Sequence, residues 1–198
     1  MLGILLIDKP QSFTSHDVVN KIRRALNTKR VGHAGTLDPL ATGLLVVAVG
    51  PATRFLQYLP LEPKEYVGWF QFGASTPTQD AESDPDEVRP VPTDLEQRLL
   101  DAGGDFVGEI TQIPPMYSAV KKDGRPLYDY ARKGLEVERE SRSVYIEELS
   151  ILEKDGDRVL FKVVCSGGTY VRTLAHDLGQ AVGCGAHLAS LRRTKVGK

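Results

Sequence analysis

The chain has 198 residues, of which 41% are apolar and 26% charged, and its formal net charge is −1. These values are typical of an ordinary globular protein with enough residues for one substantial core. The two cysteines, Cys165 and Cys184, lack the close spacing of a zinc knuckle or a redox pair. No stretch approaches the roughly 18 consecutive apolar residues that cross a membrane. We therefore expect no disulfide framework, no membrane span and a protein of the reducing cytoplasm.

Charge is segregated along the chain. Residues 18–37 carry five basic residues and no acid, and residues 192–198 carry four basic residues and no acid. Residues 80–109 carry ten acids against two arginines. A chain of this kind can present a basic face to phosphate although its total charge is near zero. The alternative is that these residues form solvated helix faces, and charge alone does not decide between the two.

The first half of the chain predicts a strand, a helix and two further strands. The opening "MLGILLIDKP" predicts a strand, because its apolar run is short and has no positive lead-in as a signal peptide would. Residues 14–26 predict a helix with Thr14 or Ser15 as N-cap. The apolar run 44–50 predicts a strand buried on both faces, and the aromatic-rich run 65–73 predicts another strand.

The middle of the chain is irregular. Residues 76–92 predict an acidic loop with four prolines. A capping box at Thr93–Glu96 predicts the start of a helix that runs to about Ala102. Residues 112–134 combine a double proline, three tyrosines and five basic residues with a helix-like end at which Gly134 is the C′ residue.

The last third predicts a hairpin and a helix. Residues 143–165 read as two strands joined around Asp155–Gly156. Residues 166–183 predict a helix with Thr169 as N-cap and an apolar face of Val171, Leu174, Ala175 and Leu178. Because strands outnumber helices and often follow one another, we predict an α/β (α+β) domain on a mixed, mainly antiparallel sheet flanked by helices and loops.

Several common catalytic motifs are missing from the sequence. There is no phosphate-binding loop ending in Gly-Lys-Ser/Thr, no GxGxxG that opens a helix and no GxSxG. The four histidines show no paired metal-ligand spacing. Nucleotide-cofactor, metal and serine-hydrolase chemistry are therefore disfavoured.

A single carboxylate stands on a glycine-rich loop, "GHAGTLDPLATG", at residues 32–43. The glycines at 32, 35 and 43 permit backbone angles that other residues avoid and allow close approach to a ligand. Pro39 keeps the preceding Asp38 out of the helical region and restricts its direction. This pattern suits a positioned nucleophile. The alternative is that Asp38-Pro39 only starts a turn.

Tyr170 and Arg172 lie two residues apart at the predicted start of a helix. A guanidinium close to a carboxylate lowers the pKa of the acid and keeps it ionised, as a nucleophilic aspartate requires. The alternative is that Arg172 pairs with Asp177 or with a surface acid. By pattern alone, Tyr66 is predicted to be a core residue and His33 a hydrogen-bonded loop residue.

Six motifs occur in the order found in the TruB family of bacterial tRNA pseudouridine-55 synthases, which this chain resembles from about residue 3 to residue 197. They are "DKPQSFTSHDVV", "GHAGTLDPLATGLLVVAVGPATR", "KEYVGWFQFG", "PPMYSAVKKDGRPLYDYARKG", "CSGGTYVRTLAHDLG" and "GCGAHLASLRRTKVG". The resemblance implies a pseudouridine-synthase-like fold. It also implies isomerisation of one uridine in the T loop of tRNA at position 55, on a flipped-out base, with no cofactor and no metal.

The resemblance also implies roles for individual residues. Asp38 would be the nucleophile and Arg172 its ion-pair partner, while Tyr170 lines the pocket. Tyr66 would stack on the target base and is the favoured proton acceptor at carbon 5. Whether Asp38 attacks the sugar C1′ or the base C6, or first removes a sugar proton, is left open by the sequence.

Further residues are implied in RNA binding. His33 would lie against the RNA, Leu191 would close the pocket wall and Lys9 would support the site as part of the substrate-binding set. The segment of about 112–142 resembles the family's RNA-gripping insertion. The basic residues expected to contact the RNA backbone are Arg23, Arg24, Lys29, Arg30, Lys121, Lys122, Arg132, Arg192 and Arg193.

The sequence departs from the family in places. Gln11-Ser12 stands where a small residue and glycine are usual, and "STPTQDAE" alters the stretch that follows Tyr66. We expect residues 1–198 to form one catalytic domain, the family's C-terminal RNA-binding domain to be absent or shortened, and the protein to be monomeric. Two other readings remain: an RNA-binding or RNA-folding module of the same fold without activity, and an aspartate-nucleophile hydrolase that would release uracil.

Overall fold

The computed structural model describes residues 2–197 and confirms the predicted fold class, an α/β fold on a mixed sheet. The strands of the central sheet are β1 Gly3–Lys9, β2 Val31–Ala34, β3 Thr42–Val49, β4 Lys64–Phe72, β7 Gly108–Gln112, β10 Arg142–Asp155, β11 Arg158–Cys165 and β12 Ala186–Val196. The helices are α1 Ser15–Ala25, α2 Leu95–Gly103, α3 Leu127–Ala131 and α4 Val171–Val182, with 3-10 turns η1 Gly50–Tyr58 and η2 Gly104–Phe106. Two small ribbons pair β5 Ala74–Ser75 with β6 Glu87–Val88, and β8 Lys121–Lys122 with β9 Arg125–Pro126.

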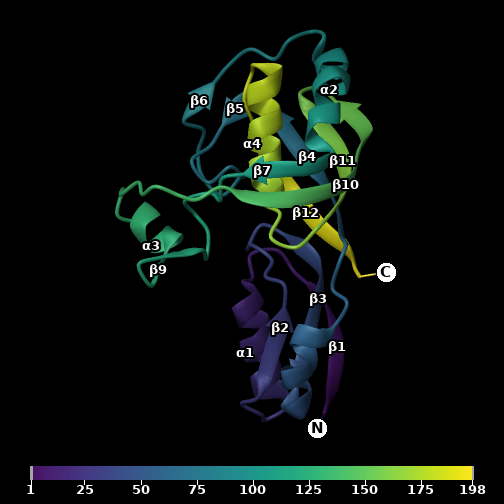
Figure 1. Ribbon diagram of the computed structural model, residues 1–198, viewed down its shortest axis with the longest axis vertical. Coiled ribbons are helices and arrows are strands. Elements are labelled where there is room, and N and C mark those ends of the chain that lie inside the picture. Colours follow the sequence, from purple (N-terminus) through teal and green to yellow (C-terminus); the bar gives the residue numbers. More distant parts are fainter. Residues whose placement is uncertain (1, 198) are drawn as a thin grey trace.

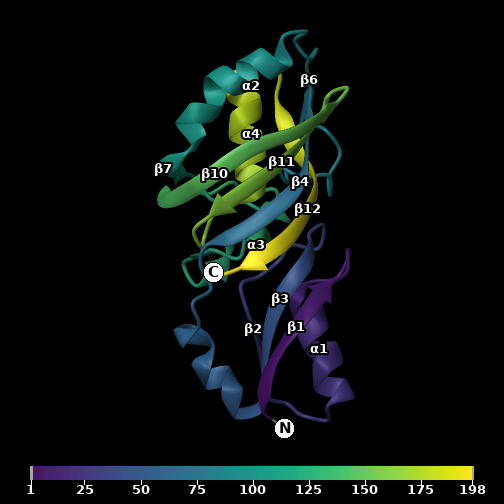
Figure 2. The same ribbon diagram turned by 90° about the vertical axis from the view of Figure 1, so that its right-hand side faces the viewer.

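The eight-stranded sheet runs β1-β3-β12-β4-β11-β10-β7, with β2 paired to β3 beside this path. Every pair is antiparallel except β12 with β3, where Arg192 lies beside Thr42 and Arg193 beside Gly43. That parallel contact joins the two halves of the molecule seen in Figure 1, with β1, β2, β3, α1 and η1 below and α2, α4 and the remaining sheet above. Figure 2 shows the same division from the side.

Each half has its own apolar core. The lower core gathers Val18 and Val19 of α1 against Leu45 and Val47 of β3. The upper core places Leu174, Ala175 and Leu178 of α4 against the strands around the stacked rings of Phe70 and Phe161. The apolar face predicted for α4 is therefore confirmed. The functional cleft lies where the two halves meet.

Of the three helix starts predicted from the sequence, one is confirmed and two are wrong. Thr14 is the N-cap of α1 and forms a reciprocal capping box with Asp17, as one of the two candidates predicted. The predicted box at Thr93–Glu96 is wrong: Asp94 is the N-cap of α2 and makes no side-chain cap bond. Thr169 is not the N-cap of α4 either, because its hydroxyl donates to the carbonyl of Ser166.

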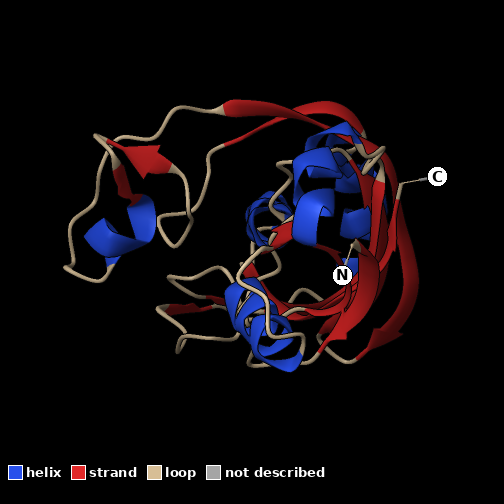
Figure 3. Cartoon of the chain, turned by 90° about the horizontal axis from the view of Figure 1, so that it is seen from below, coloured by secondary structure: helices blue, strands red, loops and turns tan. Residues whose placement is uncertain are grey.

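The segment between β7 and β10 projects from the sheet as an arm that contains β8, β9 and α3 (Figure 1; Figure 3). We call residues 113–141 the arm. Its short helix α3 ends at Ala131, and the turn that follows contains Gly134, the predicted C′ residue, with φ +67°. The amides of Gly134 and Leu135 donate to the carbonyls of Ala131 and Tyr130, closing the turn in the manner of a Schellman motif.

Within the described residues, none of the helices is long and apolar enough to cross a bilayer.

Candidate active site

Asp38 lies on a loop that joins β2 to β3, and three residues between the end of β1 and the start of α1 hold this loop on both sides of the aspartate. Ser15 is buried, accepts the Leu37 amide at 2.8 Å and donates to the Leu37 carbonyl at 3.2 Å. The Ser12 amide donates to the carbonyl of Pro39 at 2.9 Å. Lys9 Nζ reaches the same carbonyl at 3.4 Å. We call Lys9, Ser12 and Ser15 the clamp.

The clamp corrects one expectation. Lys9 is fully buried and donates to the carbonyls of Pro10 and Phe13, so it supports the loop from beneath and does not line the cleft with the predicted substrate-binding residues. Ser12, at one of the positions where the sequence departs from the family, has φ +67°, the left-handed conformation that glycine adopts most easily.

Two glycines of the Asp38 loop, Gly35 and Gly43, are required for different structural reasons. Gly35 has φ +81°, and its carbonyl accepts a hydrogen bond from the buried Arg193 guanidinium at 3.1 Å. Gly43 has φ +96° and leaves no room for a Cβ, because the Arg193 backbone passes directly against it. The close approach predicted at residue 43 is thus made by strand β12 and not by a ligand.

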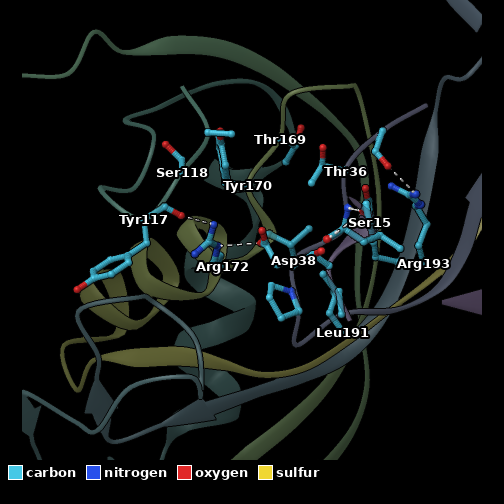
Figure 4. A pocket seen from close by; sticks show the side chains of 18 of the residues that line it. Ser15, Thr36, Asp38, Tyr117, Ser118, Thr169, Tyr170, Arg172, Leu191 and Arg193 are labelled. Carbon is cyan, nitrogen blue, oxygen red and sulfur yellow. Dashed lines mark hydrogen bonds and ion pairs between the residues drawn. The ribbon is translucent and has the colours of Figure 1, made fainter. Parts of the chain in front are cut away.

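Arg172 enters the cleft from the first turn of α4 and faces Asp38 (Figure 4). The distance between Arg172 Nε and Asp38 Oδ2 is 3.1 Å, and Arg172 is only 5% exposed. Pairing with Asp177, one of the alternatives, is therefore wrong. The guanidinium also donates to the carbonyl of Tyr117 in the arm at 2.8 Å and to that of Thr78 at 3.2 Å.

Asp80 is the site residue that sequence reasoning missed. It is fully buried, and its Oδ2 lies 3.4 Å from Arg172 Nη1. The other carboxylate oxygen accepts the Thr78 hydroxyl at 2.6 Å and the Glu82 amide at 3.0 Å. Asp80 stands inside the acidic stretch predicted to be a solvated loop, where the only local signal was a Thr-x-Asp pattern beside four other acids.

The electrostatic balance at Asp38 differs from the prediction. The surrounding protein removes water from the carboxylate and raises its pKa, and the negative charge of Asp80 adds to this effect. Arg172 and Lys9 oppose the rise, but desolvation is the larger cause and the pKa lies above its usual value. The direction holds for the protein alone, in which 43% of the Asp38 side chain is exposed to the cleft, and a bound base would remove that water as well. The predicted net lowering is therefore wrong, although its cause, the guanidinium, is in place.

The cleft encloses about 700 Å³ and is lined by the predicted pocket residues Tyr66, Tyr170, Leu191 and His33. Tyr66 projects from β4 and is 8% exposed, so it is both a core residue and a pocket residue. Tyr170 is the N-cap of α4, and its ring centroid lies 6.0 Å from Arg172 Cζ. Leu191 lies in β12 and lines the same cleft (Figure 4).

His33 is in β2 at the mouth of the cleft. Its Nδ1 is buried and has no hydrogen-bond partner among residues 2–197. Burial is the main cause that lowers the pKa of this imidazole, with smaller effects from the charges of Arg193 and His16. The pattern-based prediction of a hydrogen-bonded loop residue is therefore wrong for this nitrogen, and His33 lies in a strand.

The nine residues expected at the RNA backbone fall into three groups. Six are exposed, and they are Arg24, Lys29, Arg30, Lys121, Arg132 and Arg192. Arg192 makes a bidentate pair with Asp8 at the surface, with distances of 3.0 and 2.8 Å. Arg23 and Lys122 are partly buried and donate to the carbonyls of Val31 and Glu138. Arg193 is only 1% exposed, so the expectation that it contacts phosphate is wrong.

The chain matches two family models in succession. The model described as TruB family pseudouridylate synthase (N terminal domain) matches residues 23–171. The model described as tRNA pseudouridylate synthase B C-terminal domain matches residues 172–198.

Relatives and solved structures extend the match over almost the whole chain. "tRNA pseudouridine synthase B" of Opitutus terrae is 52% identical over 196 residues, which is 99% of this chain and 81% of the relative. The protein of the same name from Stutzerimonas stutzeri is 52% identical over 195 residues, but the chain spans only 64% of that relative.

Two solved structures superpose on 98% of the chain. A Cbf5-Nop10-Gar1 complex contains a chain with 36% identity and a TM-score of 0.74, of which 48% is covered. An H/ACA RNP bound to a substrate RNA containing 2′-deoxyuridine contains one with 33% identity and a TM-score of 0.70, of which 47% is covered. With the Asp38 loop, the Tyr66 strand and the Arg172 helix converging on one cleft, these matches place the chain in the TruB family of pseudouridylate synthases.

Proposed function

We propose that this chain isomerises uridine to pseudouridine in the T loop of tRNA. The observation that carries the proposal is the carboxylate of Asp38, held 3.1 Å from the Arg172 guanidinium in a cleft of about 700 Å³. Such a volume suits a nucleoside, since small-molecule pockets measure about 300–1,000 Å³. The relatives named tRNA pseudouridine synthase B support tRNA as the substrate.

A uridine inside a folded loop has to leave the base stack before it can enter this cleft, at a cost of a few kcal/mol. Stacking on an aromatic ring returns about 1–3 kcal/mol per base. We assign that contact to Tyr66, which lines the cleft from β4. We assign to Leu191 of β12 an apolar part of the cleft wall.

The isomerisation breaks the bond between C1′ and N1 and forms a bond between C1′ and C5 of the same base. N1 gains a proton and C5 loses one, so atoms and charge balance without an external reactant. Asp38 serves as the nucleophile or base that starts the reaction, and Arg172 holds its oxygen in place. We assign the acceptance of the C5 proton to Tyr66, which lines the same cleft.

We assign the positioning of the RNA to phosphate contacts from the exposed basic residues of α1, the following turn and the arm. The shape of the T arm would then give selectivity. We further propose that residues 1–198 act as one catalytic domain with the arm as its insertion, and that the protein is a monomer of the cytoplasm.

The proposal is tested by incubating the protein with an unmodified tRNA transcript and mapping pseudouridine by carbodiimide treatment and primer extension. We expect one modified uridine, in the T loop, and none with Asp38→Asn. Binding of the transcript without modification would instead identify an RNA-binding module, and release of free uracil would identify a hydrolase.

A further inference from the structure

Arg193 is a buried cation that the steps above do not use. It is 1% exposed and lies on β12 directly opposite Tyr66 of β4 in the antiparallel register. Residues paired in this way project from the same face of a sheet, so the two side chains are neighbours. The distance from Arg193 Cζ to the centroid of the Tyr66 ring is 6.0 Å, and both residues line the cleft.

The guanidinium has only neutral partners. Nε donates to the Leu44 carbonyl at 2.7 Å and Nη2 to the Gly35 carbonyl at 3.1 Å. Among residues 2–197, no carboxylate lies within ion-pair distance of Arg193, in contrast to Arg172, which has two. Burying a cation without a counter-charge is costly. An interaction with negative charge that develops during the reaction would account for its retention.

Tyr66 is a neighbouring group that can carry such a charge. Burial raises the pKa of its hydroxyl, and the charges of Cys165 and Asp38 act in the same direction. The positive charge of the neighbouring Arg193 is the largest influence in the opposite direction, towards the phenolate form.

We propose that Arg193 is a positioning residue that orients the Tyr66 hydroxyl and stabilises negative charge on its oxygen while that oxygen takes the proton from carbon 5 of the base. This inference rests on the proposed function. In the step, the Tyr66 oxygen takes the proton from C5 while its own hydroxyl proton passes through water to N1. The electron pair of the C5–H bond forms the C5=C6 double bond and the C6=N1 pair moves to N1, so the tyrosine ends neutral and N1 carries the proton that C5 has lost.

The test compares two RNAs, a T-arm stem-loop with uridine at the target position and the same stem-loop with 5-fluorouridine. Fluorine replaces the proton at C5, so the second RNA can undergo bond cleavage and rejoining but not the step assigned to Tyr66. With Arg193→Met we expect the single-turnover rate on uridine to fall by about 100-fold, the lower end of the range for lost acid–base assistance, and with Arg193→Lys, which keeps a positive charge, by only about 10-fold. Conversion of 5-fluorouridine should stay within about three-fold of wild type.

The control variant is Arg89→Met, which removes a guanidinium paired with Glu87 outside the cleft and should change neither rate. The double variant Tyr66→Phe/Arg193→Met should be no slower than Tyr66→Phe alone, because both changes remove one step. Equal slowing on both RNAs would show that Arg193 only holds the Asp38 loop through Gly35, and it would overturn the proposal. Undiminished uridine turnover would overturn it too.

A second measurement covers the case in which the Arg193 variants do not fold. Tyr66→Phe removes the hydroxyl that Arg193 faces, so we expect its melting temperature to fall by about 4 °C. Tyr145→Phe, at an exposed tyrosine, should leave the melting temperature unchanged. Equal melting temperatures for Tyr66→Phe and wild type would exclude the contact. If the wild-type protein forms no pseudouridine in the RNA, the proposed function itself is rejected. That outcome differs from every result that would overturn only the role of Arg193.

Discussion

The Asp38 loop and the arm both reach Arg172, but they are held in opposite ways. The loop is fixed by the buried Ser15 hydroxyl and by hydrogen bonds from Lys9 and Ser12 to its Pro39 carbonyl. The arm stands away from the sheet (Figure 3) and touches the guanidinium through one carbonyl, that of Tyr117. A reacting carboxylate needs a rigid support, whereas a segment that grips RNA needs reach.

The substitution Asp38→Asn should separate the roles of the two regions, catalysis by the loop and RNA binding by the arm, most clearly. The amide keeps the size of the side chain but cannot act as a nucleophile, so we expect turnover to fall by about 1,000-fold or more. The affinity for tRNA should stay within a few-fold, because the arm and the basic residues are untouched. Single-turnover assays and filter binding measure the two effects, and residual activity above one per cent would show that the nucleophile is misassigned.

Acidification should affect the loop alone. Asp38 has to be ionised to react, and its pKa is raised by burial, so protonation begins at a higher pH than the usual value of about 3.9. Below that pKa the single-turnover rate should fall by about tenfold per pH unit, because only the ionised carboxylate reacts. A pH series of rates and binding constants checks this. An acid limb at or below 3.9 contradicts it.

The arm should respond to the loss of its cations. The double variant Lys121→Ala/Arg132→Ala removes two exposed charges, so we expect tRNA affinity to fall by about tenfold and the salt slope to decrease by up to about 2. The rate at saturating tRNA should change little. Lys154→Ala, an exposed cation at the far end of β10, serves as the control. A flat salt response in the wild-type protein would contradict the phosphate contacts.

Ser15→Ala tests the clamp itself. It leaves the buried Leu37 amide without its acceptor, which costs about 1–3 kcal/mol of the free energy of unfolding. Because the loop then loses its fixed direction, we expect the turnover rate to fall several-fold with little change in affinity. Ser15→Thr retains the hydroxyl and should restore part of the rate. Thermal melts and kinetics together decide whether the clamp positions Asp38.

The smallest effect is expected at Ser12. A non-glycine residue with φ +67° costs about 1 kcal/mol, so Ser12→Gly should stabilise the protein by roughly that amount without changing turnover. Gly134→Ala, at φ +67° in the arm, is the matched opposite change and should destabilise only the arm's last turn. A Ser12→Gly variant no more stable than wild type would show that the left-handed turn is not strained.

Local patterns predicted most of the fold. The alternating burial of β4, the apolar run of β3 and the inward face of α4 follow from residue order alone. The cap of α4 was missed because this helix begins where a distant element supplies the contact. The Tyr170 amide donates to the side chain of Gln112 in β7.

The sequence by itself determined the fold class, the loop that carries Asp38 and the family to which the chain belongs, because these rest on short-range patterns and ordered motifs. Only the tertiary structure decided the charge balance of the site. Asp80 is buried beside Arg172, and Arg193 is buried on β12 opposite Tyr66 of β4. The physical reason is that burial and ion pairing depend on which distant strands and helices meet. The type of a residue and its neighbours in sequence do not specify which residues surround it in the folded chain.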